Sequence, residues 1–282
     1  MAQRPETAPE LDAREFPFTD ADFERIRRMI HARVGISLNA TKRNMVYSRI
    51  ARQLRAHDFG SFPEFLDAAD RDPKYDQAFI NALTTNLTSF FRESHHFPLL
   101  AHYLASLPRR GPIDLWCSAA STGEEPYSMA ITAIEAFDSP KPPVRILATD
   151  VDTHVLDVAR KGVYRTEGVA QLPPERLKRH FLRGTGAHEG MVRVRPEVQA
   201  LVTFRPLNLL APRWDVGGPL AAIFCRNVMI YFDKPTQAAI LARFVPLLAP
   251  GGLLFAGHSE NFTRATPELR LRGKTVYERV AA

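Results

Sequence analysis

The sequence is poor in cysteine: Cys117 and Cys225 are its only two, and each lies inside an apolar run typical of a strand. We therefore expect two buried thiols rather than a disulfide or a pair of metal ligands. No apolar run approaches the ~20 residues that span a bilayer, and the N-terminal stretch lacks the apolar core of a signal peptide. These absences predict a protein of the reducing cytoplasm that does not insert into a membrane.

The composition is otherwise that of a globular protein. The chain has 282 residues, of which 45% are hydrophobic and 24% charged, enough for one large and one smaller domain. Residues 1–16 are rich in proline and glutamate and predict a disordered tail. Residues 17–83 predict a small helical domain. In residues 84–282 strands alternate with helices, which predicts a doubly wound α/β domain, with a hairpin-bearing β-subdomain inserted at about 162–205.

The net charge of +6 is unevenly distributed along the sequence. A helix expected at residues 40–57 has an apolar face, and its opposite side is basic, with Lys42, Arg49, Arg52 and Arg55. Such a face suits an acidic partner, which on charge alone is a nucleic acid, an anionic membrane or an acidic protein surface. A solvated helix face is the simpler alternative.

The stretch IDLWCSAASTGEEPYSM, residues 113–129, organises the larger domain. It predicts a short strand at 113–117, a turn of small residues, two carboxylates, and a helix starting at Pro126. Open α/β sheets hold nucleotide-like ligands at such strand–turn–helix junctions, because the first helical turn offers free N–H donors. Glu124 or Glu125 could accept hydrogen bonds from a ribose diol. The alternative is an ordinary junction with a capping carboxylate.

Polar side chains also follow the other predicted parallel strands. Asp150 follows the strand at 144–149, Asn208 lies near the end of the run at 202–210, and Arg226 and Asn227 follow a buried strand. The carboxyl ends of parallel strands form the ligand-binding edge of such sheets. No Walker lysine, metal-ligand cluster or Ser–His–Asp spacing accompanies them, so we expect an adenosyl ligand and no essential metal.

Two adenosyl ligands fit these residues: a dinucleotide with hydride transfer, or S-adenosyl-L-methionine (SAM) with methyl transfer. Gly123 is the only glycine of the turn, so the GxGxxG phosphate signature is absent. SAM has no pyrophosphate to cradle and is therefore favoured. A polar segment upstream supports a binding site, because Asn86, Thr88 and Arg92 are spaced to project from about one turn toward a common point.

Four segments carry a family resemblance: NALTTNLTSFFRESHHFPLL, WCSAASTGEEPYSMAI, FCRNVMIYFDK and GLLFAGHSENF. In consistent order they resemble the CheR-type chemotaxis receptor protein-glutamate O-methyltransferases, over about residues 18–280. The resemblance implies a Rossmann-like class I SAM-dependent methyltransferase domain with an inserted small β-subdomain, preceded by an all-α N-terminal domain. It also implies SAM as the cofactor and S-adenosyl-L-homocysteine as its product.

The resemblance further implies roles for individual residues. The SAM contacts carry over onto Asn86, Thr88, Arg92, Glu125, Asp150, Asn208, Leu209, Arg226 and Asn227. Arg92 and Tyr231 are similar to family residues close to the transferred methyl group and are expected to be catalytic. The turn of Gly184, Thr185 and Gly186 resembles family members that dock on a C-terminal peptide tether of the receptor. The basic helix would then face the cytoplasmic helical domain of the receptor.

The implied reaction is an in-line displacement, in which a receptor glutamate attacks the sulfonium methyl group. A normal glutamate is already ionised at neutral pH, so catalysis becomes mainly positioning and desolvation. A nucleic-acid methyltransferase is the alternative, but it would more often show a Pro-Pro-aromatic motif where this sequence has RNVMIY. A SAM-binding sensor without activity is disfavoured by the presence of both Arg92 and Tyr231.

Overall fold

The computed structural model describes residues 15–108, 111–263 and 266–280. The chain divides into two compact units, one of Met1–Met29 with Leu38–Leu83, the other of Ile30–Ser37 with Thr84–Ala282. Most of the tail expected over residues 1–16 lies outside the described residues. Within the described ranges, no helix combines the length and the apolar character that a membrane crossing requires.

The first unit is helical, as predicted. Its elements are α1 (Asp20–Val34) as far as Met29, the 3-10 helix η1 (Ala40–Lys42), α2 (Arg43–Ala56), α3 (Phe62–Arg71) and α4 (Pro73–Leu83). The apolar face of α2 is buried through Val46, Ile50 and Leu54. Aromatic rings fill the space beside it, and Phe18 and Phe62 lie with their centroids 4.5 Å apart. Burial of one helical face leaves the other side of α2 to carry charge.

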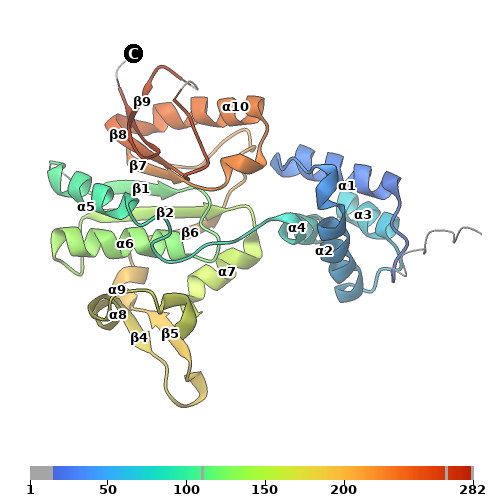
Figure 1. Cartoon of the computed structure of the whole chain (residues 1–282), viewed down its shortest axis with the longest axis horizontal. Helices are drawn as coiled ribbons and strands as arrows, with labels where there is room; N and C mark the ends of the chain where they lie inside the picture. Colours follow the sequence, from blue (N-terminus) through green and yellow to red (C-terminus); the bar gives the residue numbers. More distant parts are fainter. Residues whose placement is uncertain (1–14, 109–110, 264–265, 281–282) are drawn as a thin grey trace, which may run out of the picture. The chain divides into compact units, whose positions relative to one another are not determined.

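The second unit is built on a seven-stranded sheet (Figure 1). Five neighbouring strands run parallel in the order β6 (Val202–Pro206), β2 (Val144–Asp150), β1 (Ile113–Cys117), β7 (Leu220–Cys225) and β8 (Leu248–Ala256). Two antiparallel strands complete it, β10 (Val276–Arg279) beside β8 and β9 (Leu269–Gly273) at the edge. This order confirms the predicted doubly wound α/β sheet.

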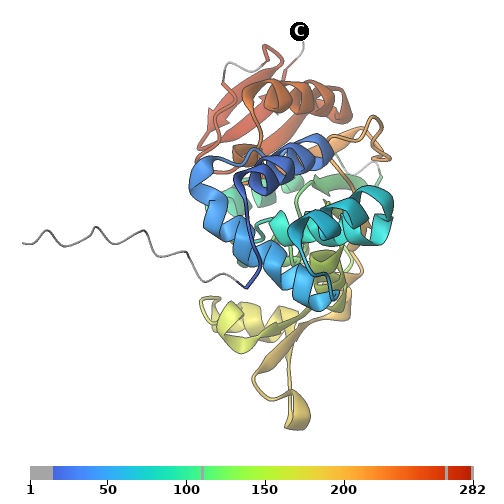
Figure 2. The same cartoon turned by 90° about the vertical axis from the view of Figure 1, so that its right-hand side faces the viewer.

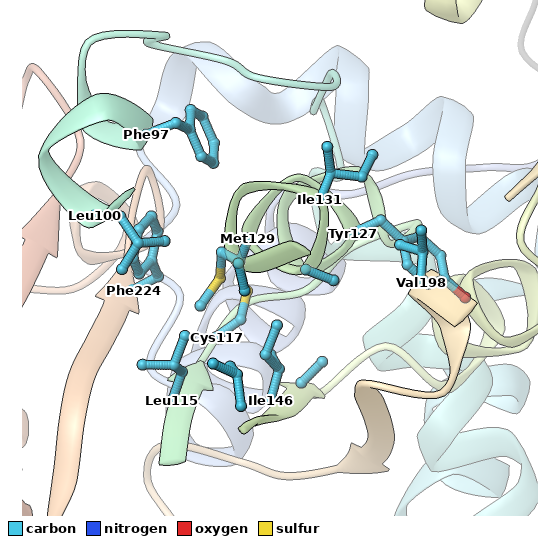
Figure 3. Close-up of a cluster of buried hydrophobic side chains, with 14 of the residues drawn as sticks. Phe97, Leu100, Leu115, Cys117, Tyr127, Met129, Ile131, Ile146, Val198 and Phe224 are labelled. Atoms are coloured by element: carbon cyan, nitrogen blue, oxygen red, sulfur yellow. The ribbon is translucent and has the colours of Figure 1, made fainter. Parts of the chain in front are cut away.

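Both faces of the sheet are covered, so the central strands are buried on both sides. On one face Leu115 and Cys117 pack with α5 (His96–Ser106) and α6 (Glu124–Phe137), as Figure 3 shows. On the other face Trp116 packs on Phe244 of α10 (Lys234–Phe244), with ring centroids 5.3 Å apart. Cys117 and Cys225 are buried free thiols, which confirms the prediction for both.

One helix boundary differs from the sequence expectation. Helix α6 begins at Glu124 rather than at Pro126, because Gly123 adopts a φ of 100° and serves as its N-cap. A Cβ at Gly123 would lie 2.8 Å from the Tyr164 hydroxyl and 2.9 Å from Ala159 Cβ, so only glycine fits. Both glutamates of the junction therefore belong to the first helical turn.

From the sequence alone, the helix after Asp233 is expected to run to Leu248 and to end at Gly251 and Gly252, but the structure differs. Helix α10 ends at Phe244, the 3-10 helix η5 (Val245–Leu247) follows, and Gly251 and Gly252 lie inside β8. A Cβ at Gly252 would lie 3.0 Å from the carbonyl oxygen of Leu220 in β7. The glycines permit an irregularity in β8, where its register with β7 shifts.

A small antiparallel sheet forms the inserted β-subdomain. Its strand order is β3 (Val163–Arg165), β5 (Met191–Val194) and β4 (Phe181–Arg183), and α7 (Thr153–Lys161) precedes it. The subdomain also holds η2 (Thr166–Val169), α8 (Pro174–His180), η3 (Gly186–His188) and α9 (Pro196–Gln199). The hairpin of β4 and β5 projects away from the large sheet in both views (Figures 1 and 2). The insertion ends before residue 202, because β6 belongs to the large sheet.

The β-subdomain is joined to the large sheet through α6. Glu135 of α6 accepts two hydrogen bonds from the Arg176 guanidinium, at 2.9 and 2.7 Å, and lies 3.1 Å from Nε2 of the buried His180. The partly buried carboxylate loses solvation, which raises its pKa, but His180 and Arg176 outweigh this and hold the pKa at about 2. The junction is therefore charged at neutral pH.

Candidate ligand-binding site

A pocket opens in the second unit, at the carboxyl ends of the parallel strands. It spans the point where β1 has β2 on one side and β7 on the other, which is the ligand-binding crevice of open α/β sheets. All ten residues predicted for cofactor binding or catalysis line it: Asn86, Thr88, Arg92, Glu125, Asp150, Asn208, Leu209, Arg226, Asn227 and Tyr231. Segments far apart in the sequence thus meet at one cavity.

Asp150 ends β2 at the floor of the pocket. Its Oδ2 accepts a hydrogen bond from the backbone N–H of Ser121 at 2.8 Å, and its Oδ1 accepts one from Asp152 at 3.0 Å. Burial raises the pKa of Asp150 to about 6, although these backbone hydrogen bonds oppose the shift. The carboxylate is therefore ionised at neutral pH but becomes protonated in mild acid.

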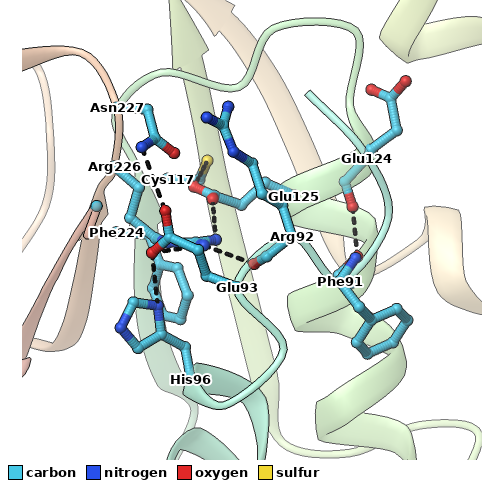
Figure 4. A network of polar contacts seen from close by, with 12 residues as sticks. Phe91, Arg92, Glu93, His96, Cys117, Glu124, Glu125, Phe224, Arg226 and Asn227 are labelled. Carbon is cyan, nitrogen blue, oxygen red and sulfur yellow. Dashed lines mark hydrogen bonds and ion pairs between the residues drawn. The ribbon is translucent and has the colours of Figure 1, made fainter. Parts of the chain in front are cut away.

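Glu125 and Arg226 form a buried ion pair at the centre of the site (Figure 4). Glu125 Oε2 lies 2.5 Å from Arg226 Nη1, and its Oε1 accepts from the Cys117 thiol at 3.3 Å. Arg226 also donates to the carbonyl oxygen of Arg92 at 2.5 Å. Glu124, by contrast, accepts from the Thr122 hydroxyl and does not line the pocket. Of the two carboxylates after the turn, only Glu125 reaches the cavity.

The segment that follows α4 is held to the α/β core by its own polar side chains. The hydroxyl of Thr84 and the amide of Asn86 both donate to Asp152 Oδ2 at 2.7 Å. Ser121 donates to the carbonyl oxygen of Asn86 at 3.0 Å, and Arg92 Nη1 donates to that of Leu87 at 2.7 Å. Thr84 and Asn86 of this segment are therefore held to Asp152, and both line the pocket.

Strained backbone occurs in the segments that form the pocket. Phe91, Glu93, Ser121 and Asn227 all have positive φ values, between 49 and 57°. Non-glycine residues rarely adopt this conformation, and they keep it where surrounding contacts over-determine it, often at functional sites.

Residues 30–37 form a wall of the pocket and belong to the second unit, whereas the sequence pattern predicts that they belong to the helical domain. Val34 and Ile36 line the cavity, the carbonyl oxygen of Arg33 accepts from Asn208 Nδ2 at 2.6 Å, and Ser37 N–H donates to the carbonyl oxygen of Tyr231 at 2.9 Å. The apolar helix pattern predicted burial correctly. It could not show which core the end of the helix joins.

The remaining predicted residues lie outside the pocket. Lys42 ends η1, and Arg49, Arg52 and Arg55 follow along α2 in the first unit. Gly184, Thr185 and Gly186 lie after β4 in the β-subdomain. Neither group lines the cavity.

Glu93 was not predicted as a site residue and lies beside three histidines. Glu93, His95 and His96 place potential ligand atoms within 4.8 Å of one another, and Glu93 Oε1 lies 3.1 Å from Nδ1 of His258. Arg226 Nη2 is only 3.3 Å from Glu93 Oε2. This fixed positive charge disfavours a cation, so Glu93 is better understood as a partner of Arg226.

Comparisons with known proteins agree with this arrangement. The family described as "CheR methyltransferase, all-alpha domain" matches residues 21–84, and "CheR methyltransferase, SAM binding domain" matches residues 86–277. A "Chemotaxis protein methyltransferase" of Klebsiella aerogenes is 56% identical over 268 residues, covering 94% of this chain and 91% of the relative. "Chemotaxis protein methyltransferase 2" of Pseudomonas aeruginosa is 54% identical, covering 96% and 97%. The "Chemotaxis protein methyltransferase" of Escherichia coli is 53% identical, covering 92% and 91%.

Proposed function

The chain belongs to the CheR methyltransferase family, and on this premise we propose that it transfers the methyl group of SAM to glutamate side chains of chemotaxis receptors. The products are glutamate methyl esters, which serve sensory adaptation. The relatives named above are chemotaxis methyltransferases that match this chain over nearly their whole length. The observation that carries the proposal is the convergence of ten predicted residues on one pocket.

The pocket is suited to SAM in its chemistry, because polar and charged side chains from several strand ends line it together with apolar ones. We assign the ribose hydroxyls to Asp150, because it ends the second strand and lines the cavity. The family resemblance favours Glu125 for this role, and Glu125 also lines the cavity, but its two oxygens already bind Arg226 and Cys117. Ser118, Ala119 and Ser121 line the turn with small side chains, so a ligand can approach the backbone closely. When bound, SAM supplies the electrophilic methyl group.

The residues near the reacting atoms have positioning roles. The methyl acceptor is a carboxylate that is ionised at neutral pH, so the site needs no general base. Arg92 is anchored by its Nη1 on the carbonyl oxygen of Leu87, which holds the guanidinium to orient either the substrate carboxylate or the methionine end of SAM. Tyr231, in η4 (Met229–Tyr231), is assigned to aim the reacting oxygen. Catalysis then rests on orientation and exclusion of water.

For the receptor we propose two docking surfaces. The first is the basic side of α2, which would face the acidic helical surface around the methylation sites. Lys42, Arg52 and Arg55 are exposed, whereas Arg49 is half-buried and donates to the carbonyl oxygen of Ala82 at 3.4 Å. Arg49 therefore has a structural role as well, and the three exposed residues are the better probes of docking.

The second surface is the turn after β4, which we propose as the dock for a C-terminal receptor peptide. The backbone requires glycine at both glycine positions of the turn. A Cβ at Gly184 would collide with the carbonyl oxygen of His188, and Gly186 has a φ of 58°. Thr185 is exposed and is the member whose side chain is available to a peptide. We further propose that the protein acts in the cytoplasm, which its two free cysteines support.

The test is transfer of label from methyl-labelled SAM to receptor-containing membranes. We expect label in the receptor that mild base releases as methanol, since esters hydrolyse where methylated amines do not. Asp150→Asn and Tyr231→Phe should reduce the transfer. Label in added nucleic acid instead of receptor, or SAM binding without transfer to any receptor, would contradict the proposal.

A further inference from the structure

Two glutamates outside the predicted site both bind Asn227, the residue that follows Arg226 at the end of β7. Asn227 Nδ2 donates to Glu93 Oε1 at 3.2 Å, as Figure 4 shows. The backbone N–H of Asn227 donates to Glu260 Oε2 at 3.0 Å. Glu93 and Glu260 come from different parts of the chain, and they fix the side chain and the backbone of the same pocket residue.

The Glu260 carboxylate accepts hydrogen bonds from several backbone N–H groups of the turn after β7. Its Oε1 accepts from Val228 at 3.0 Å and from Met229 at 2.8 Å, and its Oε2 accepts from Asn227 and, at 2.5 Å, from Gly257. Glu260 is 4% exposed, so water does not compete for these donors. The carboxylate thereby fixes the chain between β7 and η4.

The turn needs this support because Asn227 has a φ of 57°, in the left-handed region that disfavours a side chain. Successive N–H groups that converge on an anion stabilise such a conformation. Gly257 packs directly against it, since a Cβ there would collide with the Asn227 amide. The backbone of Asn227 therefore has little freedom.

Glu93 fixes the direction of the Asn227 amide. Burial raises the pKa of Glu93, but the charge of Arg226 and hydrogen bonds from His258 and Asn227 outweigh it and hold the pKa at about 2. An ionised carboxylate only accepts hydrogen bonds, so Asn227 must present its Nδ2 to it. The Oδ1 atom is then the end of the amide left for the pocket that Asn227 lines.

We propose that Glu93 and Glu260 are positioning residues that hold Asn227 as a hydrogen-bond acceptor toward the pocket, where Oδ1 takes an N–H or O–H donor of the ligand. The proposal rests on the proposed function, because it takes the ligand to be an adenosyl amino-acid compound. Such a ligand offers its α-ammonium group and its ribose hydroxyls as donors.

Exchanging the carboxylate and the amide between positions 93 and 227 tests whether the Asn227 amide points its Nδ2 at Glu93 and its Oδ1 at the pocket. In Asn227→Asp alone, two carboxylates would stand about 3 Å apart, and we expect S-adenosylhomocysteine to bind at least about tenfold more weakly. In the double variant Glu93→Gln/Asn227→Asp, the glutamine amide can donate to one aspartate oxygen and leave the other facing the pocket. The net charge beside Arg226 is unchanged. We therefore expect the double variant to bind better than Asn227→Asp, and a double variant that binds no better overturns the proposal.

A second measurement distinguishes the two donors. We expect Asn227→Ala to lower the affinity for S-adenosylhomocysteine about tenfold, which is the effect of losing about one hydrogen bond to a charged or polar group. 5′-Methylthioadenosine keeps the ribose but lacks the amino-acid end. If the affinity for 5′-methylthioadenosine falls equally, Asn227 accepts a hydrogen bond from a ribose hydroxyl. If that affinity does not fall, Asn227 accepts one from the α-ammonium group. Unchanged binding of both compounds overturns the proposal.

Glu260→Gln tests the backbone support. The amide group would set its own N–H donors against the N–H groups of the turn, so we expect weaker S-adenosylhomocysteine binding and recovery in Glu260→Asp. Glu175→Gln is the matched control, because that side chain is 88% exposed on α8. Thermal unfolding identifies variants that fail to fold. If Glu260→Gln fails to fold, the comparison of Asn227→Asp with the double variant Glu93→Gln/Asn227→Asp still tests the proposal. If the wild-type protein itself does not bind S-adenosylhomocysteine, the proposed function fails and not this inference alone.

Discussion

Glu125 Oε2 lies 2.5 Å from Arg226 Nη1, and both side chains are withdrawn from solvent, with exposed fractions of 10% and 0%. Glu125 stands in the first turn of α6, after β1, and Arg226 follows β7, the parallel neighbour of β1. The ion pair therefore bridges the two strands between which the ligand pocket opens. It couples the stability of the fold to the geometry of the site.

Glu125→Ala should lower the free energy of unfolding by about 3 kcal/mol, because it removes the nearer carboxylate of the buried Arg226 charge and leaves the more distant Glu93. Urea unfolding at neutral pH measures the change. Glu124→Ala is the neighbouring control, and loss of the hydrogen bond that its side chain accepts from Thr122 should cost about 1 kcal/mol or less. Equal losses in the two variants would mean that the buried pair is not the stronger contact.

Tyr231→Phe should lower turnover about 10- to 100-fold at saturating SAM, while the KM for SAM stays within about twofold, because the hydroxyl is assigned to orientation and not to SAM binding. Steady-state transfer to receptor separates the two parameters. Tyr103→Phe removes a hydroxyl from α5, outside the pocket, and should leave both unchanged. An unchanged turnover in Tyr231→Phe removes this residue from the mechanism.

Binding of S-adenosylhomocysteine should weaken as the pH falls below about 6, because Asp150 is then protonated and accepts ribose hydrogen bonds poorly. A single proton gives a loss approaching tenfold per pH unit. Calorimetry at pH 7.5 and pH 5 measures it. Asp150→Asn should bind weakly at both values and show a smaller difference, and an equal pH dependence would assign the titration to another group.

The same carboxyl group should affect folding in the opposite direction. Burial raises the pKa of Asp150 from its ordinary value of 3.8 to about 6 in the folded protein, so the folded state binds the proton more tightly than the unfolded chain. Its stabilising contribution is fully present below pH 3.8 and is lost as the pH rises through about 6, by about 3 kcal/mol. Urea unfolding without ligand should show this difference between wild type and Asp150→Asn.

Reversing charge on the basic helix should impair receptor methylation but not ligand binding. We expect Lys42→Glu with Arg52→Glu to raise the KM for receptor about tenfold, most strongly at low salt, because long-range attraction to an acidic surface is lost. Affinity for S-adenosylhomocysteine should not change. Lys74→Glu on α4 makes the same kind of charge change in the same unit and serves as control. An equal effect of the control would assign the loss to net charge.

Local patterns in the sequence predicted most elements of the fold. The strand at 113–117 has the predicted bounds, because an apolar run marks it within a few residues. The error at Gly251 and Gly252 has a different origin. A glycine that follows a helix usually ends it. Here the two glycines instead allow a shift in the register of β8 with β7, and β7 lies about 30 positions earlier in the chain.

From the residues alone, periodicity predicted the layered α/β fold, and the polar strand ends predicted a ligand site at one edge of the sheet, where the carboxyl ends of parallel strands meet. Leu209 and Tyr231 are assigned to the pocket only by the family resemblance, and the wall formed by Val34 and Ile36 was not predicted. How the pocket residues are held becomes visible only in the folded chain. Asn227 donates hydrogen bonds to Glu93 and Glu260, which lie 134 and 33 positions away in the sequence. Asn208 donates one to the carbonyl oxygen of Arg33, which lies 175 positions away. A polar loop residue has no periodic signal, so its hydrogen-bond partner is fixed only when packing brings distant backbone together.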